Sequence, residues 1–219
     1  MNTVVKKTRV NLKKLAYQEI KSKIVNCVYS PGSLLNENVL AGELNISRTP
    51  IREALNQLHH EGLLQIMPKK GILVSNITVA DMSQIYQVRL EIEPFVIRIC
   101  GPHLDSDKLM QFRELFVNES EEAGSLQQLE VDTGFHRYCA NNCNNKYIQQ
   151  LMDKVLDENK RVVISTMNDV RLEHSRDEHI KIIDLLLAGE YETASSTMRE
   201  HIGNCRDSAF YFFLNKAKD

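Results

Sequence analysis

The pattern of apolar residues changes between Ser75 and Thr78, and this change constrains the fold more than any other feature of the sequence. Before it, helical periodicity alternates with turn-forming residues and short β-capable runs; after it, the pattern is helical almost throughout. A chain of 219 residues is long enough for two modest domains. We therefore predict a mainly α protein with two domains, residues 1–76 and residues 77–219.

The first region is predicted to form three helices and a hairpin. Apolar residues recur at helical spacing over residues 12–28, 37–44 and 48–62, with turn-forming residues between them. Two β-capable runs, residues 63–67 and 71–74, then flank a basic tip. This order predicts a winged helix-turn-helix. The core positions are expected to be Leu15, Ile20, Ile24, Val28, Val39, Leu40, Leu44, Ile51, Ala54, Leu55 and Leu58.

The turn before the third helix carries two residues suited to it. Asn tolerates the left-handed conformation, so Asn45 can make the turn. Ser47 is a good N-cap, which places the start of the helix at Arg48, and Gly62 suits its C-cap.

The third helix presents residue types that contact DNA. An α-helix fits the major groove, and its N-terminal residues approach the base edges first. Arg48 and Arg52 lie one turn apart and can donate to guanine or phosphate, while the hydroxyl groups of Ser47 and Thr49 can hold phosphate. On an isolated helix such arginines usually only solvate the surface. The complete order of helix, turn, helix and basic wing favours DNA binding.

Charge is distributed unevenly along the chain. Residues 1–76 contain 11 Lys and Arg against 5 Asp and Glu, whereas the remaining residues contain 16 against 24. This asymmetry favours contact of the first region with phosphate, although a chance excess of lysine on a solvated face fits the counts equally well. Lys69 and Lys70, at the tip of the predicted wing, can reach a neighbouring groove or the DNA backbone.

The second region is predicted to form an all-α bundle of about six helices. The helices are expected over residues 78–100, 106–122, 125–141, 147–167, 170–188 and 191–215. Thr78 and Asp81 resemble a capping box at the start of the first, and Ser106 and Ser125 can cap the next two. The aromatic run at residues 210–213 is more typical of a core or a dimer interface than of a platform for stacking bases.

One aspartate and three histidines of the second region form a candidate metal site. Asp132 and His136 are one helical turn apart, and His179 and His201 lie on two later helices. A carboxylate and three imidazoles from three packed helices can converge in a bundle core, and this set suits a divalent ion such as Zn²⁺, Ni²⁺ or Mn²⁺. Spacing alone leaves open that each histidine is a hydrogen-bonded core residue. Of the other histidines, His59 and His60 lie at the end of the predicted third helix, and His103 and His174 are expected at the surface.

Other features limit the class of protein. The five cysteines are scattered and odd in number, which argues against a disulfide framework and for a reducing compartment. The first 14 residues lack the apolar core of a signal peptide, and no apolar run approaches the roughly 20 residues that span a bilayer. We therefore expect a cytoplasmic protein with no membrane partner.

Residues 15–74 resemble the DNA-binding domain of GntR-type bacterial regulators. The matching run is LAGELNISRTPIREALNQLHHEGLL, followed by PKKG. The best-known members of the family often have Arg where this sequence has Asn38. The contact that this Arg makes with a phosphate or a base is therefore not expected to carry over to Asn38. The resemblance implies that operator DNA is contacted at the positions of Arg48, Thr49, Arg52 and Gly71.

Residues 81–215 resemble the FCD sensor domain of the FadR branch of this family. The matching pieces are VRLEIEP, DTGFHRYCANNCNN, DEHIKIIDLLLAGEYETA and REHI, and six helices indicate the shorter, VanR-like group. The resemblance implies a ligand-sensing and dimerisation domain in which a metal completes a cavity for a small organic acid. It implies the metal ligands Asp132, His136, His179 and His201, and the effector residues Arg89 and Asn145.

Arg89 and two further residues have alternative roles. A guanidinium binds a carboxylate in a bidentate way, so Arg89 suits an effector clamp, and a salt bridge to Glu93 suits it as well. Asn144 replaces a family glycine and tolerates the same left-handed conformation. Cys205, one turn after His201, can lean toward the metal, although packing explains it more simply.

These features together predict a homodimeric transcription regulator, by family habit a repressor. Each winged domain would read half of a palindromic operator, and a small carboxylate bound at the metal site would modulate operator affinity. Three alternatives stay open: a regulator for which the ion itself is the signal, a metal-dependent hydrolase, and a purely structural ion. The hydrolase is disfavoured because the sequence contains no well-placed general base, glycine-rich phosphate loop or nucleophile motif, so we expect no enzyme.

Overall fold

The computed structural model describes residues 11–68, 70–118, 125–166 and 169–216. The chain forms two compact units, which divide between Asn76 and Ile77. Among the described helices, none combines the length and the apolar character needed to cross a membrane.

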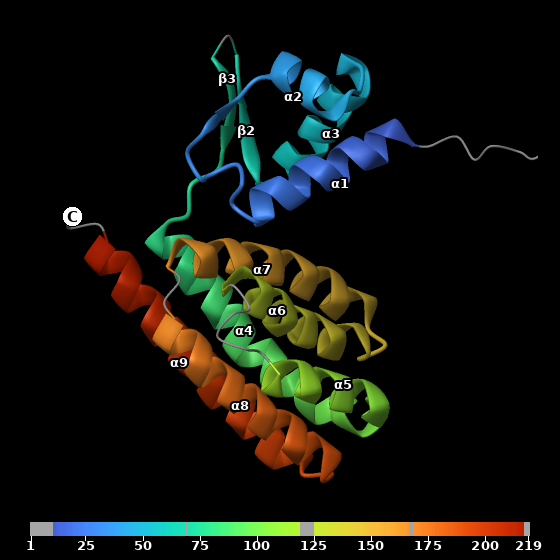
Figure 1. Ribbon diagram of the computed structural model, residues 1–219, viewed down its shortest axis with the longest axis vertical. Coiled ribbons are helices and arrows are strands. Elements are labelled where there is room, and N and C mark those ends of the chain that lie inside the picture. Colours follow the sequence, from blue (N-terminus) through green and yellow to red (C-terminus); the bar gives the residue numbers. More distant parts are fainter. Residues whose placement is uncertain (1–10, 69, 119–124, 167–168, 217–219) are drawn as a thin grey trace, which may run out of the picture. The chain divides into compact units, whose positions relative to one another are not determined.

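The first unit combines three helices with a small antiparallel sheet (Figure 1). Its elements are α1 (Leu12–Val25), β1 (Leu34–Leu35), α2 (Glu37–Leu44), α3 (Arg48–His60), β2 (Leu64–Met67) and β3 (Gly71–Val74). β3 lies between β1 and β2 and pairs antiparallel with both. The predicted winged helix-turn-helix is therefore confirmed. β1 was not predicted, because two residues are too few to show a period.

One face of α3 packs against α1 and forms the core of this unit. The predicted core positions on α3 are all buried, and α1 contributes a row spaced four residues apart. The buried residues of the two helices are Ala16, Ile20, Ile24, Val25, Ile51, Ala54, Leu55 and Leu58.

Three predicted core positions are wrong. Leu15 is 37% exposed, Val28 66% and Val39 65%. Leu15 lies one position away from the buried row of α1. Val28 lies beyond the end of that helix, which stops at Val25 because Cys27 adopts a positive φ of 52°. Val39 faces solvent on a helix of eight residues whose one buried residue is Leu40.

The boundaries of α3 follow its turn chemistry. Asn45 has a φ of 52°, so the expected left-handed turn is present. Ser47 occupies the N-cap position in an extended conformation, but its side chain makes no capping hydrogen bond. The helix ends at His60, two residues earlier than predicted, and Gly62 follows with a φ of 86°.

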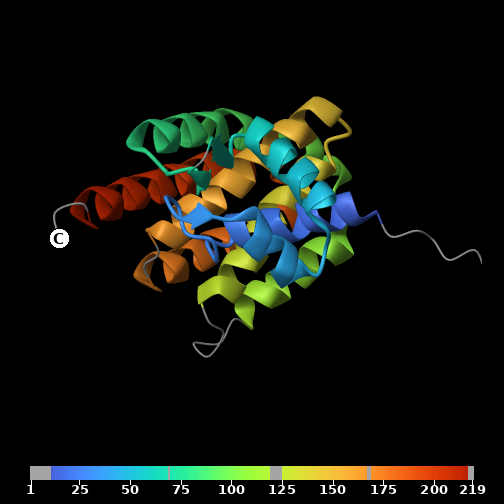
Figure 2. The same ribbon diagram turned by 90° about the horizontal axis from the view of Figure 1, so that it is seen from above.

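The second unit contains six α-helices within the described residues, as predicted. They are α4 (Val79–Cys100), α5 (Ser106–Val117), α6 (Ser125–Asn141), α7 (Lys146–Ser165), α8 (Asp169–Leu187) and α9 (Tyr191–Lys216), and a short 3₁₀ turn at Gly101–His103 follows α4. α9 runs beside α4, as Figures 1 and 2 both show, and α8 packs between α9 and α5. α6 and α7 pack against each other and against α4.

The caps of α4 and α5 differ in how well the sequence predicted them. Thr78 and Asp81 form the expected reciprocal capping box. Asp105, rather than Ser106, caps α5, since its side chain accepts a hydrogen bond from the backbone N–H of Lys108 at 2.9 Å. The helix ends at Val117 rather than Glu122, which lies outside the described residues.

The aromatic run near the end of α9 is divided between core and surface. Phe210 and Phe213 pack against the hydrophobic core of the second unit, whereas Tyr211 is 64% exposed. The predicted role of this run in the core is therefore confirmed for Phe210 and Phe213.

Candidate metal centre and nucleic-acid interface

The start of α3 presents polar and basic side chains to solvent. Ser47, Arg48 and Thr49 are exposed, and Arg52 lies one turn later on the exposed face opposite the α1 contact. The guanidinium of Arg52 donates to both carboxylate oxygens of Glu37 on α2, with its Nη2 at 2.9 Å and its Nε at 3.3 Å. This bidentate pair fixes the direction of Arg52, and a phosphate or guanine would have to compete with Glu37 for it.

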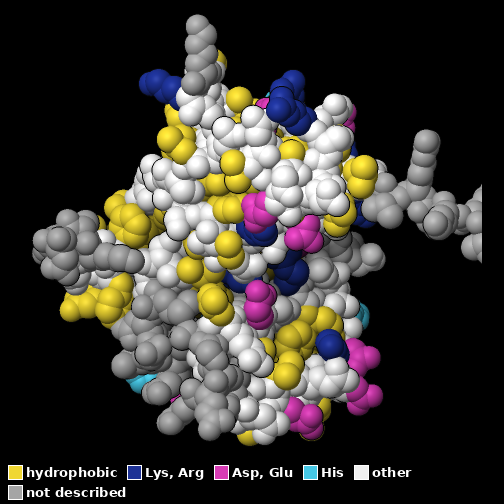
Figure 3. Space-filling model, turned by 45° about the horizontal axis from the view of Figure 1, so that its top comes forward, with side chains coloured by type: hydrophobic (Ala, Val, Ile, Leu, Met, Phe, Trp, Pro, Cys, Tyr) yellow, Lys and Arg dark blue, Asp and Glu magenta, His cyan; other side chains and the backbone are white. Residues whose placement is uncertain are grey.

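The wing joins β2 to β3 through a basic tip. Lys70 is exposed, and Lys69 lies outside the described residues. Gly71 opens β3 with a φ of 114°, and a Cβ atom there would lie 3.1 Å from the backbone oxygen of Leu35. The positive φ strains any other residue at this position, and the close approach of β1 adds to the cost, so the backbone itself favours glycine here. In Figure 3, Lys and Arg side chains (dark blue) protrude from the unit that carries the wing.

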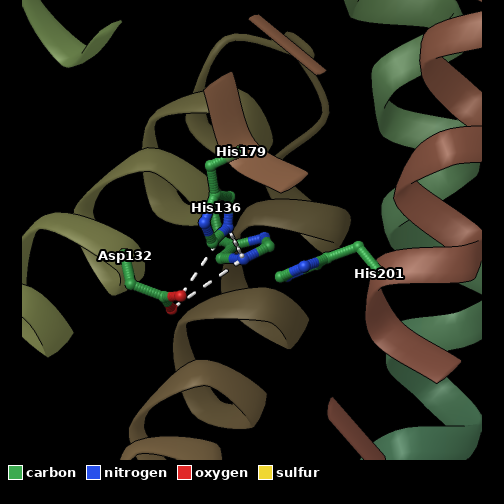
Figure 4. Close-up of side chains that lie close together, drawn as sticks. All are labelled: Asp132, His136, His179 and His201. Carbon is green, nitrogen blue, oxygen red and sulfur yellow. Dashed lines mark hydrogen bonds and ion pairs between the residues drawn. The ribbon is translucent and has the colours of Figure 1, made fainter. Parts of the chain in front are cut away.

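The four predicted metal ligands lie together in the core of the second unit (Figure 4). Asp132 and His136 come from α6, His179 from α8 and His201 from α9, and one ligand atom of each lies within 4.8 Å of the others. The three histidines are buried and Asp132 is half-buried. The Nε2 atoms of His136 and His179 are 3.0 Å apart, and the carboxylate of Asp132 lies 3.9 Å and 3.6 Å from them.

These separations fit a shared cation. Ligand atoms about 2.0–2.1 Å from a tetrahedral ion lie roughly 3.3 Å from one another, and the observed distances bracket that value. Burying three imidazoles and a carboxylate with their ligand atoms converging is costly unless something satisfies them. This group can therefore hold a metal ion. The other histidines, His59, His60, His103 and His174, are exposed and lie outside the group.

Arg89 and Glu93 on α4 join the cluster from a further side. The Nε of Arg89 donates to Glu93 Oε1 at 2.5 Å, and Glu93 Oε2 lies 2.5 Å from Nδ1 of His136. Burial alone would raise the pKa of Glu93, but the positive charge of Arg89 and the interaction with His136 hold that pKa well below its usual value. The Nη2 of Arg89 also lies 3.5 Å from Nε2 of His136. The salt bridge considered from the sequence thus exists, and it places Arg89 beside a candidate ligand.

His201 has two partners on its own side of the cluster. Its Nδ1 lies 2.7 Å from Oε2 of Glu178, and its Nε2 lies 3.7 Å from the sulfur of Cys205. Burial lowers the pKa of His201, whereas Cys205, Glu178 and Asp132 raise it, and the net effect is a pKa of about 10. Sequence reasoning gave Glu178 no role at this site, because nothing in the spacing shows that a residue next to His179 reaches the following helix.

Asn145 has a structural task. Its side-chain oxygen accepts hydrogen bonds from the backbone N–H groups of Tyr147 and Ile148, at 3.0 Å and 3.3 Å, and so caps α7. The side chain is exposed. Asn144 before it adopts a φ of 46°, as expected for a residue that replaces glycine. The contact of Asn145 with an effector stays a prediction.

Family comparisons cover most of the chain. A profile described as the FCD domain matches residues 84–204. A second, described as bacterial regulatory proteins of the gntR family, matches residues 12–74.

Several named relatives are similar over 70% or more of their length. The chain is 25% identical over 194 residues to an uncharacterized HTH-type transcriptional regulator, YdhC, of Bacillus subtilis, covering 86% of each chain. It is 28% identical over 178 residues to the gluconate operon transcriptional repressor of B. subtilis, covering 78% of this chain and 70% of the relative. It is 25% identical over 202 residues to the transcriptional repressor RspR of Escherichia coli, covering 88% and 86%.

Solved structures share the fold. E. coli McbR/YncC superposes with a TM-score of 0.82 at 19% identity, covering 93% of this chain and 99% of that one. A GntR-type regulator from Rhodococcus sp. RHA1 superposes with a TM-score of 0.77 at 21% identity, covering 90% and 97%. At these identities the likeness concerns the arrangement of the helices and strands alone.

Proposed function

Because the chain belongs to the GntR family of bacterial transcription regulators and carries the FCD domain, we propose that it is a repressor whose operator affinity a small carboxylate controls. Its relatives are transcription regulators and not enzymes, so the hydrolase has no support. Some of those relatives are named as repressors, which supports repression rather than activation as the proposed effect on transcription. A repressor of this kind acts in the cytoplasm, where bacterial operators lie.

One observation carries the proposal: a single chain combines an exposed arginine-bearing helix with a buried four-ligand cluster. α3 presents Arg48 and Arg52 at the surface of the first unit, and the second unit gathers the cluster in its core. The first suits contact with DNA, and the second suits a small ligand. A chain that carries both features suits a regulator in which a small ligand bound at the cluster changes the affinity of α3 for DNA.

The effector is proposed to be a small organic acid. The guanidinium of Arg89 lies beside His136, so a carboxylate could contact both Arg89 and a metal held by the cluster. The metal would act as a Lewis acid for that carboxylate, and three imidazoles with one carboxylate suit Zn²⁺, Ni²⁺ or Mn²⁺. One relative takes its name from a gluconate operon, so gluconate is a reasonable first probe.

The DNA partner is proposed to be a palindromic operator bound by a homodimer. Each winged unit would place α3 in a major groove, with Arg48, Thr49 and Arg52 near base edges or phosphate. Lys69, Lys70 and Gly71 on the wing and Ser47 at the helix start would contact the backbone or a neighbouring groove.

The test is operator binding with and without acids. An operator is first selected from random duplexes with the full chain, and its affinity is then measured with Zn²⁺ and a panel of small carboxylates that includes gluconate. A coupling of about 1–3 kcal/mol would change affinity roughly 5–150-fold. If no acid changes operator affinity or melting temperature, the sensing half of the proposal is wrong.

A regulator that senses the ion itself is the second candidate, because the cluster alone can bind a metal. The two differ in how the metal exchanges. A cofactor would stay bound through dialysis, whereas a signal would bind reversibly at micromolar concentration and change operator affinity without any acid.

A further inference from the structure

Glu178 connects the two helices that supply the last two candidate ligands. It precedes His179 on α8, yet its carboxylate reaches α9, where Oε2 lies 2.7 Å from Nδ1 of His201 and Oε1 accepts a hydrogen bond from Nδ2 of Asn204 at 2.7 Å. His201 and Asn204 are three residues apart and therefore lie on one face of α9. Both oxygens of Glu178 are thus engaged by a single helix face.

We propose that Glu178 is a positioning residue of the metal centre, which fixes the ring orientation and the tautomer of His201 so that its Nε2 lone pair faces the ion. This inference rests on the metal site of the proposed function. It adds a residue that touches neither the metal nor the effector.

The chemistry of the contact determines the tautomer. A neutral imidazole has one N–H and one lone pair, and a carboxylate can only accept. In the neutral ring that binds a metal, the 2.7 Å contact therefore places the proton on Nδ1 and leaves Nε2 as the lone-pair nitrogen. Carboxylates commonly orient metal-bound histidines in this way and raise their donor strength.

The position of Glu178 on α8 explains why it serves His201 rather than its neighbour. Successive helical residues are about 100° apart, so His179 can point into the core while Glu178 points along the contact with α9. Accordingly His179 is fully buried, whereas the Glu178 side chain is 23% exposed. α8 thus supplies one ligand directly and orients another.

Glu93 makes a similar contact with His136, but it is less suited to a test. Glu93 also pairs with buried Arg89, so removing it would leave an unpaired buried guanidinium and would disturb the effector residue together with the metal ligand. Glu178 is partly exposed, and its removal leaves the pair of Arg89 and Glu93 in place, so the effect on His201 can be interpreted directly.

The experiment measures Zn²⁺ affinity of the full chain by competition with a chromophoric chelator. Glu178→Ala should bind Zn²⁺ about 10–100-fold more weakly than wild type. Glu178→Gln keeps a neutral acceptor for the Nδ1 proton and should restore roughly half of that loss on a logarithmic scale. Asp177→Ala and Asp177→Asn are matched controls, because these substitutions remove the same charge from α8 at a residue that pairs with Arg176 at the surface. Both control variants should bind Zn²⁺ as wild type does.

A spectroscopic measurement separates positioning from general destabilisation. In ¹⁵N NMR spectra of the Zn²⁺-loaded chain, His201 of wild type should retain its proton on Nδ1, and Glu178→Ala should lose this pattern while its circular dichroism is unchanged. Equal Zn²⁺ affinity of Glu178→Ala and Asp177→Ala, with the same His201 pattern, would overturn the proposal. If the alanine variant does not fold, the comparison of Glu178→Gln with Asp177→Asn decides by the same criterion.

Failure of the metal site itself gives a different result. If the wild-type chain takes up no Zn²⁺, Ni²⁺ or Mn²⁺, the metal part of the proposed function is wrong. Crystal structures of metal-free wild type and Glu178→Ala then decide the positioning role, since an unchanged His201 ring in the variant would overturn it and a rotated ring would support it.

Discussion

His179 shows how one buried residue combines packing with ligand chemistry. Its ring stacks on Phe116 with centroids 4.7 Å apart and planes 8° apart, while its Nε2 lies 3.0 Å from that of His136. The stacking fixes the ring plane, and so the direction of the nitrogen lone pair is set by an apolar neighbour. A side chain that is held this rigidly loses little conformational entropy when it binds an ion.

His179→Ala is therefore expected to abolish tight metal binding. Removing one of four ligands should weaken Zn²⁺ binding by more than the roughly 100-fold upper value found for residues that only support a ligand. The metal-to-protein ratio after dialysis, measured by elemental analysis, checks this. His103→Ala is the control, because His103 is exposed and lies outside the cluster. A variant that still retains one equivalent of metal would contradict the assignment.

Arg52 pairs with Glu37 in this structure, whereas its proposed functional partner is operator DNA. Its pairing with Glu37 is exposed and so contributes little to stability. Arg52→Ala should leave the unfolding free energy nearly unchanged and reduce operator affinity by about 1–3 kcal/mol, or roughly 5–150-fold.

Fluorescence anisotropy over a range of salt concentrations measures the effect of Arg52→Ala. If Arg52 binds phosphate, the slope of log affinity against log salt should fall by about one unit. Arg206→Ala is the control, since Arg206 lies on α9 in the second unit and pairs with Asp207. Unchanged operator affinity in Arg52→Ala would rule out the assigned contact.

At the scale of the element, the start of α5 separates two neighbouring residues that look alike in the sequence. Both Asp105 and Ser106 are favoured N-caps. The backbone decides between them, because Asp105 is extended, with a φ of −69° and a ψ of 120°, whereas Ser106 is the first helical residue. A residue with helical dihedral angles is past the position from which a side chain caps the free N–H groups.

Asp105→Ala should therefore destabilise the protein by about 1 kcal/mol, and Ser106→Ala by much less. The cause is the lost hydrogen bond to the backbone N–H of Lys108. Urea unfolding of both variants measures the difference, with each serving as the control for the other. The reverse order of stabilities would show that Ser106 is the cap.

At the scale of the whole molecule, the two units have separate hydrophobic cores. One core gathers around α1 and α3, and the other gathers around α4, α8 and α9. The candidate metal ligands all belong to the second unit. A metal should therefore stabilise that unit and leave the first unit unaffected.

Calorimetry of the full chain with Zn²⁺ and with a chelator tests this. At a free Zn²⁺ concentration 100 times Kd, the second unit should gain about 2.7 kcal/mol, so one of two unfolding transitions should move to higher temperature. His179→Ala should show no shift. A single transition that moves as a whole would contradict independent unfolding of the units, and the absence of any shift would contradict metal binding.

Local interactions determined much of what the sequence predicted correctly. The buried face of α3, the left-handed turn at Asn45 and the capping box of Thr78 and Asp81 depend on residues within one or two turns of one another. Such interactions leave a period or a motif in the sequence. For the same reason, the spacing of Asp132 and His136 was enough to place both side chains on one helix face.

Only the tertiary structure decided which groups meet across helices. It brought His179 and His201 to the α6 pair, and it joined Glu178 to His201, because the rotation of each helix about its axis is set by packing against several neighbours. The exposure of Val39 has the same origin, since an apolar side chain carries no information about which side of a short helix will be covered. Spacing along the chain fixes angles within one helix, but the angle between helices depends on contacts far apart in sequence.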